Sequence, residues 1–188
     1  MKKKTRVWHG ILGLLIAGVF LAGIADAKSP PEKDKIVIGQ AISLSGPLAG
    51  GVAISGGKVY ELWVDEVNKN GGIYVEEYGK KLPVELKRYD DKSDIGTMTN
   101  LLEKLILEDK VDFVFPPWGT AWLFAAAPIA NKYGYILIGG PGGALKLKEL
   151  SLPYFFQVLN FSETQAPALA DIYKEVGVKS VAVVYRAD

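Results

Sequence analysis

The sequence contains no cysteine and only one histidine, His9. The lack of cysteine excludes disulfide bonds, thiol chemistry and a lipid attached to an N-terminal cysteine, so a lipoprotein is not expected. His9 lies in a segment that we expect to be removed. The remaining chain then has no Ser-His or Cys-His nucleophile pair and no ordinary zinc ligands. The composition therefore argues against an enzyme, and neither a cofactor nor a metal ion is expected.

An excess of charge of either sign is also missing. Lysine and arginine number 22 and aspartate and glutamate 21, which gives a formal net charge of +1. Removal of residues 1–27 would take away four basic side chains and one acidic side chain, leaving 161 residues with a net charge of −2. Without a basic surface, nucleic acid and anionic membranes are not expected as partners.

The N-terminus has the layout of a secretory signal peptide. Lys2, Lys3, Lys4 and Arg6 precede an apolar run over residues 11–25, which ends in the small-x-small pattern Ala25-Asp26-Ala27. A retained membrane anchor is the alternative, because an apolar run of this length is near the short limit for a spanning helix. Either reading places the rest of the chain in the periplasm or on the extracellular side of the membrane. Residues 28–35 are polar and proline-rich and read as a tether.

From residue 36 onwards, apolar strand patterns alternate with helical patterns. Strands are expected at residues 36–42, 82–89, 111–115 and 135–138, with helices between them. This alternation predicts an α/β fold with a parallel sheet and helices on both faces. In the first helix, Val59, Leu62, Trp63 and Val67 form an apolar stripe, so we expect Trp63 in the core.

The pattern changes after Gly143. A helical turn at 145–150 and an extended segment at 154–159 are followed by a helix at 163–176 and a buried strand at 180–185. We interpret residues 36–153 as an N-terminal ligand-binding lobe. Residues 154–188 are interpreted as a hinge crossing and the incomplete beginning of a second, similar lobe.

Three loops follow strands of the expected sheet, at residues 43–51, 115–120 and 139–143. The carboxyl ends of parallel strands share one edge, where ligands bind in such folds. In the second loop, Thr120 is expected to cap the following helix, whose first amides would suit a carboxylate. A plain cap without a ligand is the alternative. Trp118 beside it favours a small molecule with one carboxylate and an apolar part.

Two further features suggest chemistry that the local sequence does not support. The run from Gly139 to Gly143 resembles a phosphate-binding loop, but it lacks the terminal Gly-Lys-Ser/Thr and does not follow the first strand. Asp90, Asp91 and Asp94 could serve a metal or acid–base catalysis. Helix capping ahead of the second helix is the favoured interpretation.

Four segments, taken in order, resemble a known family. They are IGQAISLSGP at 38–47, YELWVDEVNKNGGI at 60–73, YDDKSD at 89–94 and APIANKYG at 127–134. Together they are similar to the branched-chain amino acid (Leu/Ile/Val-type) solute-binding proteins of ABC transporters, over about residues 36–188. The resemblance implies a type I periplasmic-binding-protein fold that captures a small amino acid, or a related carboxylate or amide, between two lobes for a membrane permease. A ligand-sensing domain of a receptor or regulator with the same fold is the alternative.

The resemblance also implies a set of ligand-binding residues. Thr120 and Ala121 would bind the ligand carboxylate, and Pro141 and Gly143 would face the α-amino group. Ser45, on the first loop, completes the set. Gly143 departs from the family pattern because it has no hydroxyl, which leaves room for carboxylates or amides other than α-amino acids.

Overall fold

The computed structural model describes residues 32–184 and has a three-stranded parallel sheet at its centre. β1 (Ile36–Ile42) lies between β4 (Val84–Asp90) and β5 (Phe113–Val114), in the order β4-β1-β5. The pairing of β1 with β4 extends from Ile36 opposite Val84 to Ile42 opposite Asp90. All three strands therefore end at one edge of the sheet, and the predicted α/β class with a parallel sheet is confirmed.

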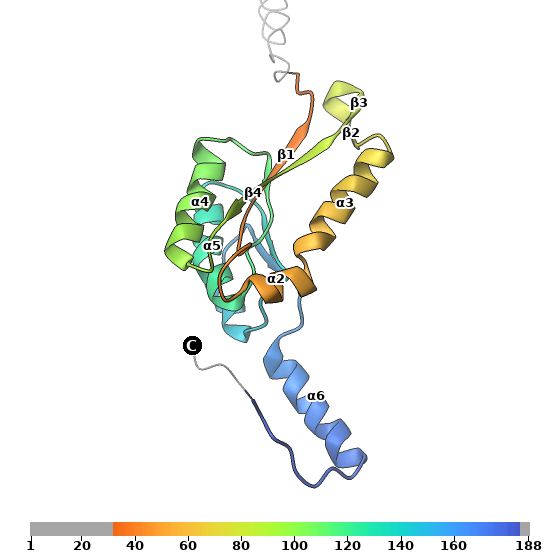
Figure 1. The fold of residues 1–188 in the computed structure, drawn as a ribbon, viewed down its shortest axis with the longest axis vertical. Coiled ribbons are helices and arrows are strands. Elements are labelled where there is room, and N and C mark those ends of the chain that lie inside the picture. Colours follow the sequence, from red (N-terminus) through yellow and green to blue (C-terminus); the bar gives the residue numbers. More distant parts are fainter. Residues whose placement is uncertain (1–31, 185–188) are drawn as a thin grey trace, which may run out of the picture. The chain divides into compact units, whose positions relative to one another are not determined.

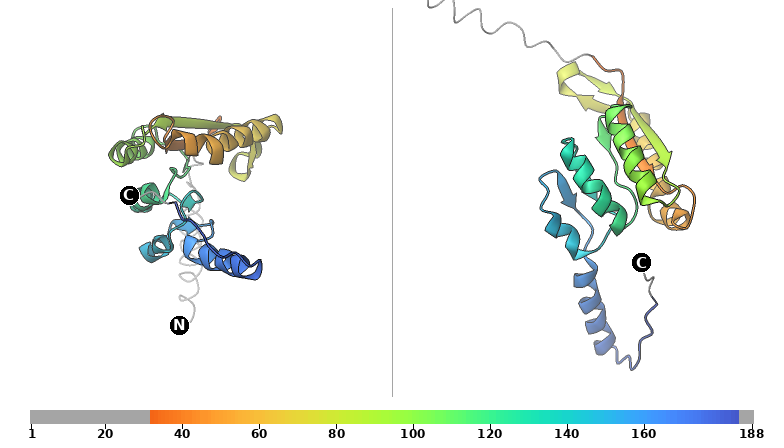
Figure 2. Two further views of the ribbon diagram at one scale, coloured as in Figure 1. Left: turned by 60° about the horizontal axis from the view of Figure 1, so that its bottom comes forward. Right: turned by 90° about the vertical axis from the view of Figure 1, so that its left-hand side faces the viewer.

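Helices cover both faces of this sheet, as predicted. Figures 1 and 2 show α4 (Ile95–Leu107) and α5 (Thr120–Lys132) side by side on one face, with α3 (Gly57–Lys69) on the other. Asp94 caps α4, since its carboxylate accepts a hydrogen bond from Thr97 N at 2.6 Å. The larger core lies between these two helices and the sheet, and its fully buried side chains include Met98, Leu105 and Leu123.

The apolar stripe predicted for the first helix is wrong at three of its four positions, and only Val67 packs against a core. Val59, Leu62 and Trp63 of α3 are exposed at 61%, 66% and 40%, whereas Val64 is buried against the sheet. Val64 belongs to the second, smaller core with Ile36, Ile38, Leu82 and Val84. Trp63 is not a core residue but lies edge-on to the ring of Phe115, with 5.9 Å between the ring centroids.

A short helix and a β-hairpin were not expected from the sequence. The helix, α2 (Ala49–Ser55), begins within the expected loop at 43–51 and precedes α3. Between α3 and β4, β2 (Ile73–Val75) and β3 (Lys80–Leu82) pair as an antiparallel hairpin around the 3₁₀ turn η1 (Glu76–Tyr78).

The expected fourth strand does not join the central sheet. It forms as β6 (Leu137–Gly139) and pairs in parallel with β7 (Phe155–Gln157) in a separate two-stranded sheet. Pro116 and Pro117 directly follow β5 and have no amide hydrogen, so the hydrogen-bond ladder of β5 cannot continue through them. β6 pairs with β7 instead.

The C-terminal part contains η2 (Leu145–Leu150) and α6 (Ser162–Glu175), close to the expected positions. The buried strand expected at 180–185 is wrong for the residues that are described, because 180–184 are exposed and form no strand. No neighbouring strand within residues 32–184 pairs with them, and an unpaired strand is not stable. Among the described helices, none is both long and apolar enough to cross a bilayer. The expected signal peptide and residues 28–31 of the expected tether lie outside the described residues.

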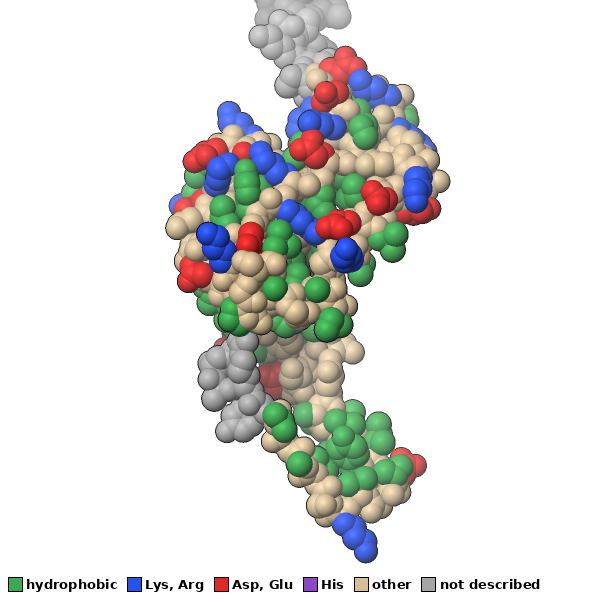
Figure 3. Space-filling view, viewed as in Figure 1, with side chains coloured by type: hydrophobic (Ala, Val, Ile, Leu, Met, Phe, Trp, Pro, Cys, Tyr) green, Lys and Arg blue, Asp and Glu red, His purple; other side chains and the backbone are tan. Residues whose placement is uncertain are grey.

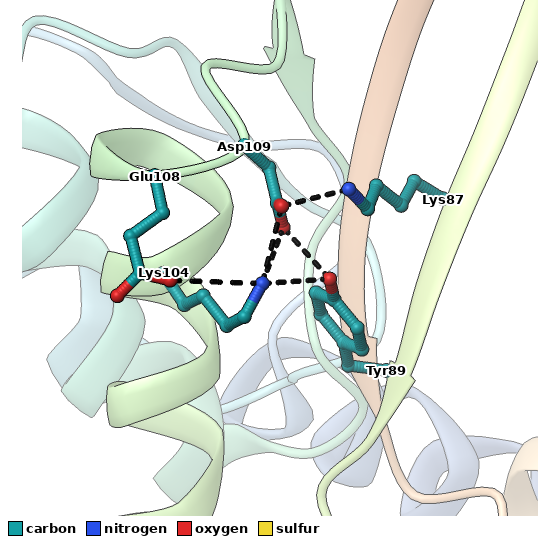
Figure 4. Close-up of polar contacts among 5 residues, drawn as sticks. All are labelled: Lys87, Tyr89, Lys104, Glu108 and Asp109. Carbon is teal, nitrogen blue, oxygen red and sulfur yellow. Dashed lines mark hydrogen bonds and ion pairs between the residues drawn. The ribbon is translucent and has the colours of Figure 1, made fainter.

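A cluster of charges ties α4 to β4 (Figure 4). Asp109 accepts hydrogen bonds from Tyr89 Oη at 2.9 Å and Lys104 Nζ at 3.1 Å, and pairs with Lys87 Nζ at 2.7 Å. The hydrogen bond from Lys87 is the main reason that the pKa of Asp109 falls to about 2. Lys104 also lies over the ring of Tyr89. The cluster is fully paired within itself and acts as a structural clamp.

Candidate functional site

The turn between β5 and α5 is held in place by a hydrogen bond from a side chain of β1. Gln40 is fully buried on β1, and its Nε2 donates to the carbonyl of Pro116 at 3.0 Å. Its Oε1 accepts from Arg88 Nε at 2.9 Å, so both ends of the amide are paired. Gly119 then takes a φ of 112°, a conformation that strains residues with a side chain. The sequence Pro-Pro-Trp-Gly thus forms a rigid turn with Trp118 at its tip.

The indole of Trp118 is held by α2. Its Nε1 donates to Ser55 Oγ at 2.6 Å, and Ser55 Oγ in turn donates to the carbonyl of Gly51 at 2.6 Å. A Cβ atom at Gly51 would lie 2.7 Å from the ring of Trp118, so only glycine leaves space for the indole there. The orientation of Trp118 therefore depends on a helix that the sequence analysis missed.

The prediction that Thr120 caps α5 is wrong. Gly119 is the N-cap residue, Thr120 is the first helical residue, and no side chain caps the helix. The hydroxyl of Thr120 instead accepts a hydrogen bond from Gly143 N at 3.2 Å. This occurs because the positive φ of Gly119 starts the helix one residue earlier than a threonine cap would. Since the oxygen accepts from Gly143, the hydroxyl hydrogen remains able to donate.

The first turn of α5 also offers backbone donors. The first intrahelical bond runs from Leu123 N to Gly119 O at 3.0 Å. The amides of Thr120, Ala121 and Trp122 precede this bond and have no intrahelical partner. Three amides and one oriented hydroxyl are thus grouped at the positive end of the helix dipole.

The loop after β6 lies directly against this turn. A Cβ atom at Gly142 would lie 3.0 Å from the Cα of Thr120, so the two backbones approach closely. Gln157 Nε2 donates to the carbonyl of Gly142 at 2.5 Å, and Ser162 N donates to the carbonyl of Gly143 at 2.7 Å. Both polar backbone groups of Gly143 are therefore occupied within the chain.

A cavity of about 950 Å³ opens beside these groups. Four of the expected site residues line it: Trp118, Thr120, Ala121 and Pro141. Gly143 lies next to it through its bond to Thr120 but does not line it. The other lining residues are Gly119 and the apolar side chains of Leu48, Ile95, Trp122 and Phe124. No lining side chain is charged, so the cavity combines an apolar wall with the donors of α5.

Ser45 does not line this cavity. Its hydroxyl donates to Asp90 Oδ2 at 2.6 Å, and Asp90 Oδ1 accepts from the amides of Leu44 and Ser45. These bonds, led by that from the Ser45 hydroxyl, lower the pKa of Asp90. Asp90 therefore clamps the loop after β1, where the sequence suggested helix capping.

Asp91 is fully buried beside it. One of its oxygens accepts from Ser43 Oγ at 2.6 Å and from Ser93 N at 2.8 Å. Burial raises the pKa of the Asp91 carboxyl, and these hydrogen bonds oppose the rise. Both aspartates thus hold loops together. Within the described part of the chain no group of three or more acidic or histidine side chains could hold a metal ion.

Sequence reasoning missed the wall formed by Leu48 and Ile95. Ile95 directly follows Asp94, the cap of α4, and therefore starts a helix at the carboxyl edge of the sheet. The position of Ile95 could have been recognised from the sequence, because any loop at the carboxyl edge of a parallel sheet can contribute to a ligand site. Leu48 lies in a turn-rich loop and gave no comparable signal.

Comparison with known proteins identifies the fold and the family. Residues 35–188 match the periplasmic binding protein family. An uncharacterised protein of Methanocaldococcus jannaschii is 26% identical over 93% of this chain and 43% of its own length. The branched-chain amino acid transporter substrate-binding protein LivJ of Streptococcus pneumoniae, solved with isoleucine, is 29% identical with a TM-score of 0.58. That match covers 67% of this chain and 34% of LivJ.

A second solved structure adds another ligand to the comparison. A solute-binding protein of an ABC transporter from Rhodopseudomonas palustris, solved with 3,4-dihydroxybenzoic acid, is 23% identical with a TM-score of 0.63, over 78% of this chain and 38% of its own. This chain thus spans less than half the length of each of these relatives. The neighbouring structures have the type I periplasmic-binding-protein fold. Because the family match extends over most of the chain, the chain belongs to the periplasmic binding protein family.

Proposed function

We propose that this chain acts as an extracytoplasmic solute-binding protein that captures a small carboxylate for the permease of an ABC importer. The observation that carries the proposal is the cavity at the start of α5, which is lined by Thr120, Ala121 and Trp122 together with apolar side chains of other elements. Family membership supports a binding function, and the site residues and the ligand class are inferred from the geometry.

The donor group fits a carboxylate. The start of a helix favours negative charge through its unpaired amides and its dipole. The Thr120 hydroxyl accepts from Gly143 N, so its own hydrogen is free to be donated. A hydrogen bond to an ionised carboxylate is shorter and stronger than one between neutral groups. We therefore assign one carboxylate oxygen to Thr120 Oγ1 and the other to the amide of Ala121.

The remainder of the ligand would lie against the apolar wall. Trp118, Trp122 and Phe124 supply aromatic surface, and no acidic side chain lines the cavity. An α-ammonium group would need acceptors, yet the carbonyls of Gly142 and Gly143 are already bonded to Gln157 and Ser162. Pro141 is the residue of this loop that lines the cavity, and its carbonyl is the acceptor that the loop could present to an ammonium group there. We infer that carboxylates with an apolar or aromatic body bind more tightly than α-amino acids.

The proposal includes no catalytic step. Asp90 and Asp91, like Ser45, do not line the cavity. Each aspartate is hydrogen-bonded to the loop after β1. We further propose that residues 36–153 form the ligand-binding lobe and that residues 154–188 cross towards a second lobe. A signal peptide at 1–27 would place the protein in the periplasm or on the outer side of the membrane.

The test is calorimetry of the purified full chain with a panel of ligands. The panel contains leucine, isoleucine, 4-hydroxybenzoate and 3,4-dihydroxybenzoate, with 4-hydroxybenzamide as the uncharged control. We expect the benzoates to bind and the benzamide to bind more weakly. Thr120→Val should reduce affinity by about 1–3 kcal/mol, because it leaves a buried polar partner unpaired. Thr120→Ser keeps the hydroxyl and should retain most of the affinity. If Thr120→Val leaves every affinity unchanged, the site is misassigned.

A further inference from the structure

Arg88 on β4 is nearly enclosed by the protein, and its side chain is only 11% exposed. Its guanidinium donates three hydrogen bonds to three different residues. Nε donates to Gln40 Oε1 at 2.9 Å, and Nη2 donates to the carbonyl of Gly57 at 2.5 Å. Nη1 donates to Glu61 Oε1 at 2.6 Å. One side chain therefore joins β4 to β1 and to the start of α3, although Arg88 itself does not line the ligand cavity.

The bond from Arg88 decides which way the amide of Gln40 faces. A guanidinium has donors and no acceptor, so it must meet the oxygen of that amide and not the nitrogen. The nitrogen of Gln40 is then left to donate to the carbonyl of Pro116, at 3.0 Å. With the amide reversed, two donors would face each other at Arg88 and two acceptors at Pro116. Arg88 therefore holds Pro116 in place through the fully buried side chain of Gln40.

The bond from Arg88 to Gly57 supports the same turn through a second set of contacts. Gly57 begins α3 and lies so close to α2 that an added Cβ atom would be 3.0 Å from the carbonyl of Val52. α2 ends at Ser55, whose hydroxyl accepts a hydrogen bond from Trp118 Nε1 at 2.6 Å. The junction of α2 and α3 thus connects Arg88 to the indole at the tip of the turn.

We propose that Arg88 is a positioning residue of the ligand cavity, which holds both supports of the turn before α5, one through Gln40 and one through Gly57. This inference rests on the proposed binding function, since Trp118 lines the cavity at the tip of that turn. The planar guanidinium presents its donors in a fixed fork, which can meet acceptors on three separate groups. A lysine ammonium carries all its donors on one nitrogen, so it cannot meet the three acceptors in the same geometry.

Arg88→Lys tests the inference directly, because it keeps the charge and removes the fork. NMR of the isotope-labelled full chain without ligand reports on the indole N–H of Trp118, whose signal is assigned by its loss in Trp118→Phe. We expect Arg88→Lys to shift this signal and to speed its exchange with solvent by about tenfold, because the hydrogen bond to Ser55 is loosened. An indole signal that keeps its position and its exchange rate would overturn the proposal.

Glu61→Gln is the matched control. Its side-chain oxygen can still accept from Arg88, so the variant removes only the charge of a side chain that is 55% exposed. Figure 3 shows acidic and basic side chains interspersed over the surface that α3 and β4 present, so the loss of one charge leaves this surface mixed. We expect the indole signal of Trp118 to stay as in the wild type. A shift as large as that in Arg88→Lys would mean that the surface charge acts on the turn, which contradicts the proposal.

Calorimetry with 4-hydroxybenzoate measures the consequence for binding. We expect Arg88→Lys to weaken affinity by about tenfold and Glu61→Gln by less than about twofold. Gln40→Glu tests the first support alone and should weaken affinity by about fivefold, because its carboxylate accepts from Arg88 but has no hydrogen for the carbonyl of Pro116. Wild-type affinity in both Arg88→Lys and Gln40→Glu would overturn the role of Arg88 in the site. If the wild type binds no ligand of the panel, the proposed function fails, and the indole signal still decides whether Arg88 holds the turn.

Discussion

α5 and α6 are helices of similar length that end up in opposite environments. Each begins with a hydroxyl residue, Thr120 or Ser162, and in neither helix does that side chain cap the first turn. Yet α5 buries five residues, whereas α6 buries none. The difference lies in the rest of each helix. α5 is apolar from Ala121 to Ala130, whereas α6 opens with four polar residues at 162–165 and carries Asp171, Lys174 and Glu175 near its end.

This difference determines what each hydroxyl can do. α5 is packed between α4 and the sheet, so Thr120 is held in a fixed frame against Gly143 and beside the cavity. A binding group must be held by its surroundings before it can select a ligand. The backbone amide of Ser162 also donates to the loop after β6, at Gly143 O, but none of the residues of α6 is buried.

The strongest test of the comparison truncates one leucine in each helix. Leu123 of α5 is fully buried, and Leu123→Ala should lower the free energy of unfolding by about 2–5 kcal/mol. Leu169 of α6 is 47% exposed, and Leu169→Ala should change it by less than about 0.5 kcal/mol in dilute protein. Urea denaturation of both variants measures the contrast. Similar losses would mean that α6 packs as α5 does.

The sequence predicted the parts of the fold that depend on local pattern. The alternation of strands and helices, the Asp94 cap and the loops at the carboxyl edge follow from residues close together in the chain. The separate pairing of β6 with β7 was not predicted, because the sequence pattern gives the strands and not which strands pair, and β5 ends early at Pro116. The wrong stripe on α3 has a similar cause, since Val64 and Trp63 both fit an apolar face and only tertiary packing decides between them.

The sequence likewise predicted the residues of the candidate site but not the contacts that hold them. Trp118, Thr120, Ala121 and Pro141 were found because they lie just after strands, and the structure brings all four to one cavity. Whether they bind the ligand remains a prediction. The role of Thr120 as an acceptor from Gly143, and the support of Trp118 by Ser55, depend on distant loops that no local pattern reveals.

A smaller effect is expected from a substitution that displaces Trp118 in the turn before α5. Gly51→Ala places a Cβ atom 2.7 Å from the indole of Trp118, which must shift away from Ser55. We expect a cost of about 1 kcal/mol, seen as several-fold weaker ligand binding in calorimetry. Gly50→Ala is the matched control in the same helix, because nothing lies within 4 Å of its added Cβ. Equal affinities for the two variants would mean that the position of Trp118 does not matter for binding.

The smallest expected effect concerns the charged clamp behind the packed region. Asp109 has a pKa of about 2 in the folded chain, below its ordinary value of about 3.9, because Lys87, Tyr89 and Lys104 bind its charged form. Its contribution to stability is therefore present above pH 4 and lost as the pH falls towards 2. Thermal midpoints of the wild type and of Asp109→Asn should differ at pH 7 and converge in acid. Asp171→Asn, on the exposed surface of α6, is the control and should keep the thermal midpoint of the wild type at pH 7. A gap for Asp109→Asn that stays constant with pH would mean that the charge of Asp109 contributes nothing to holding α4 on the sheet.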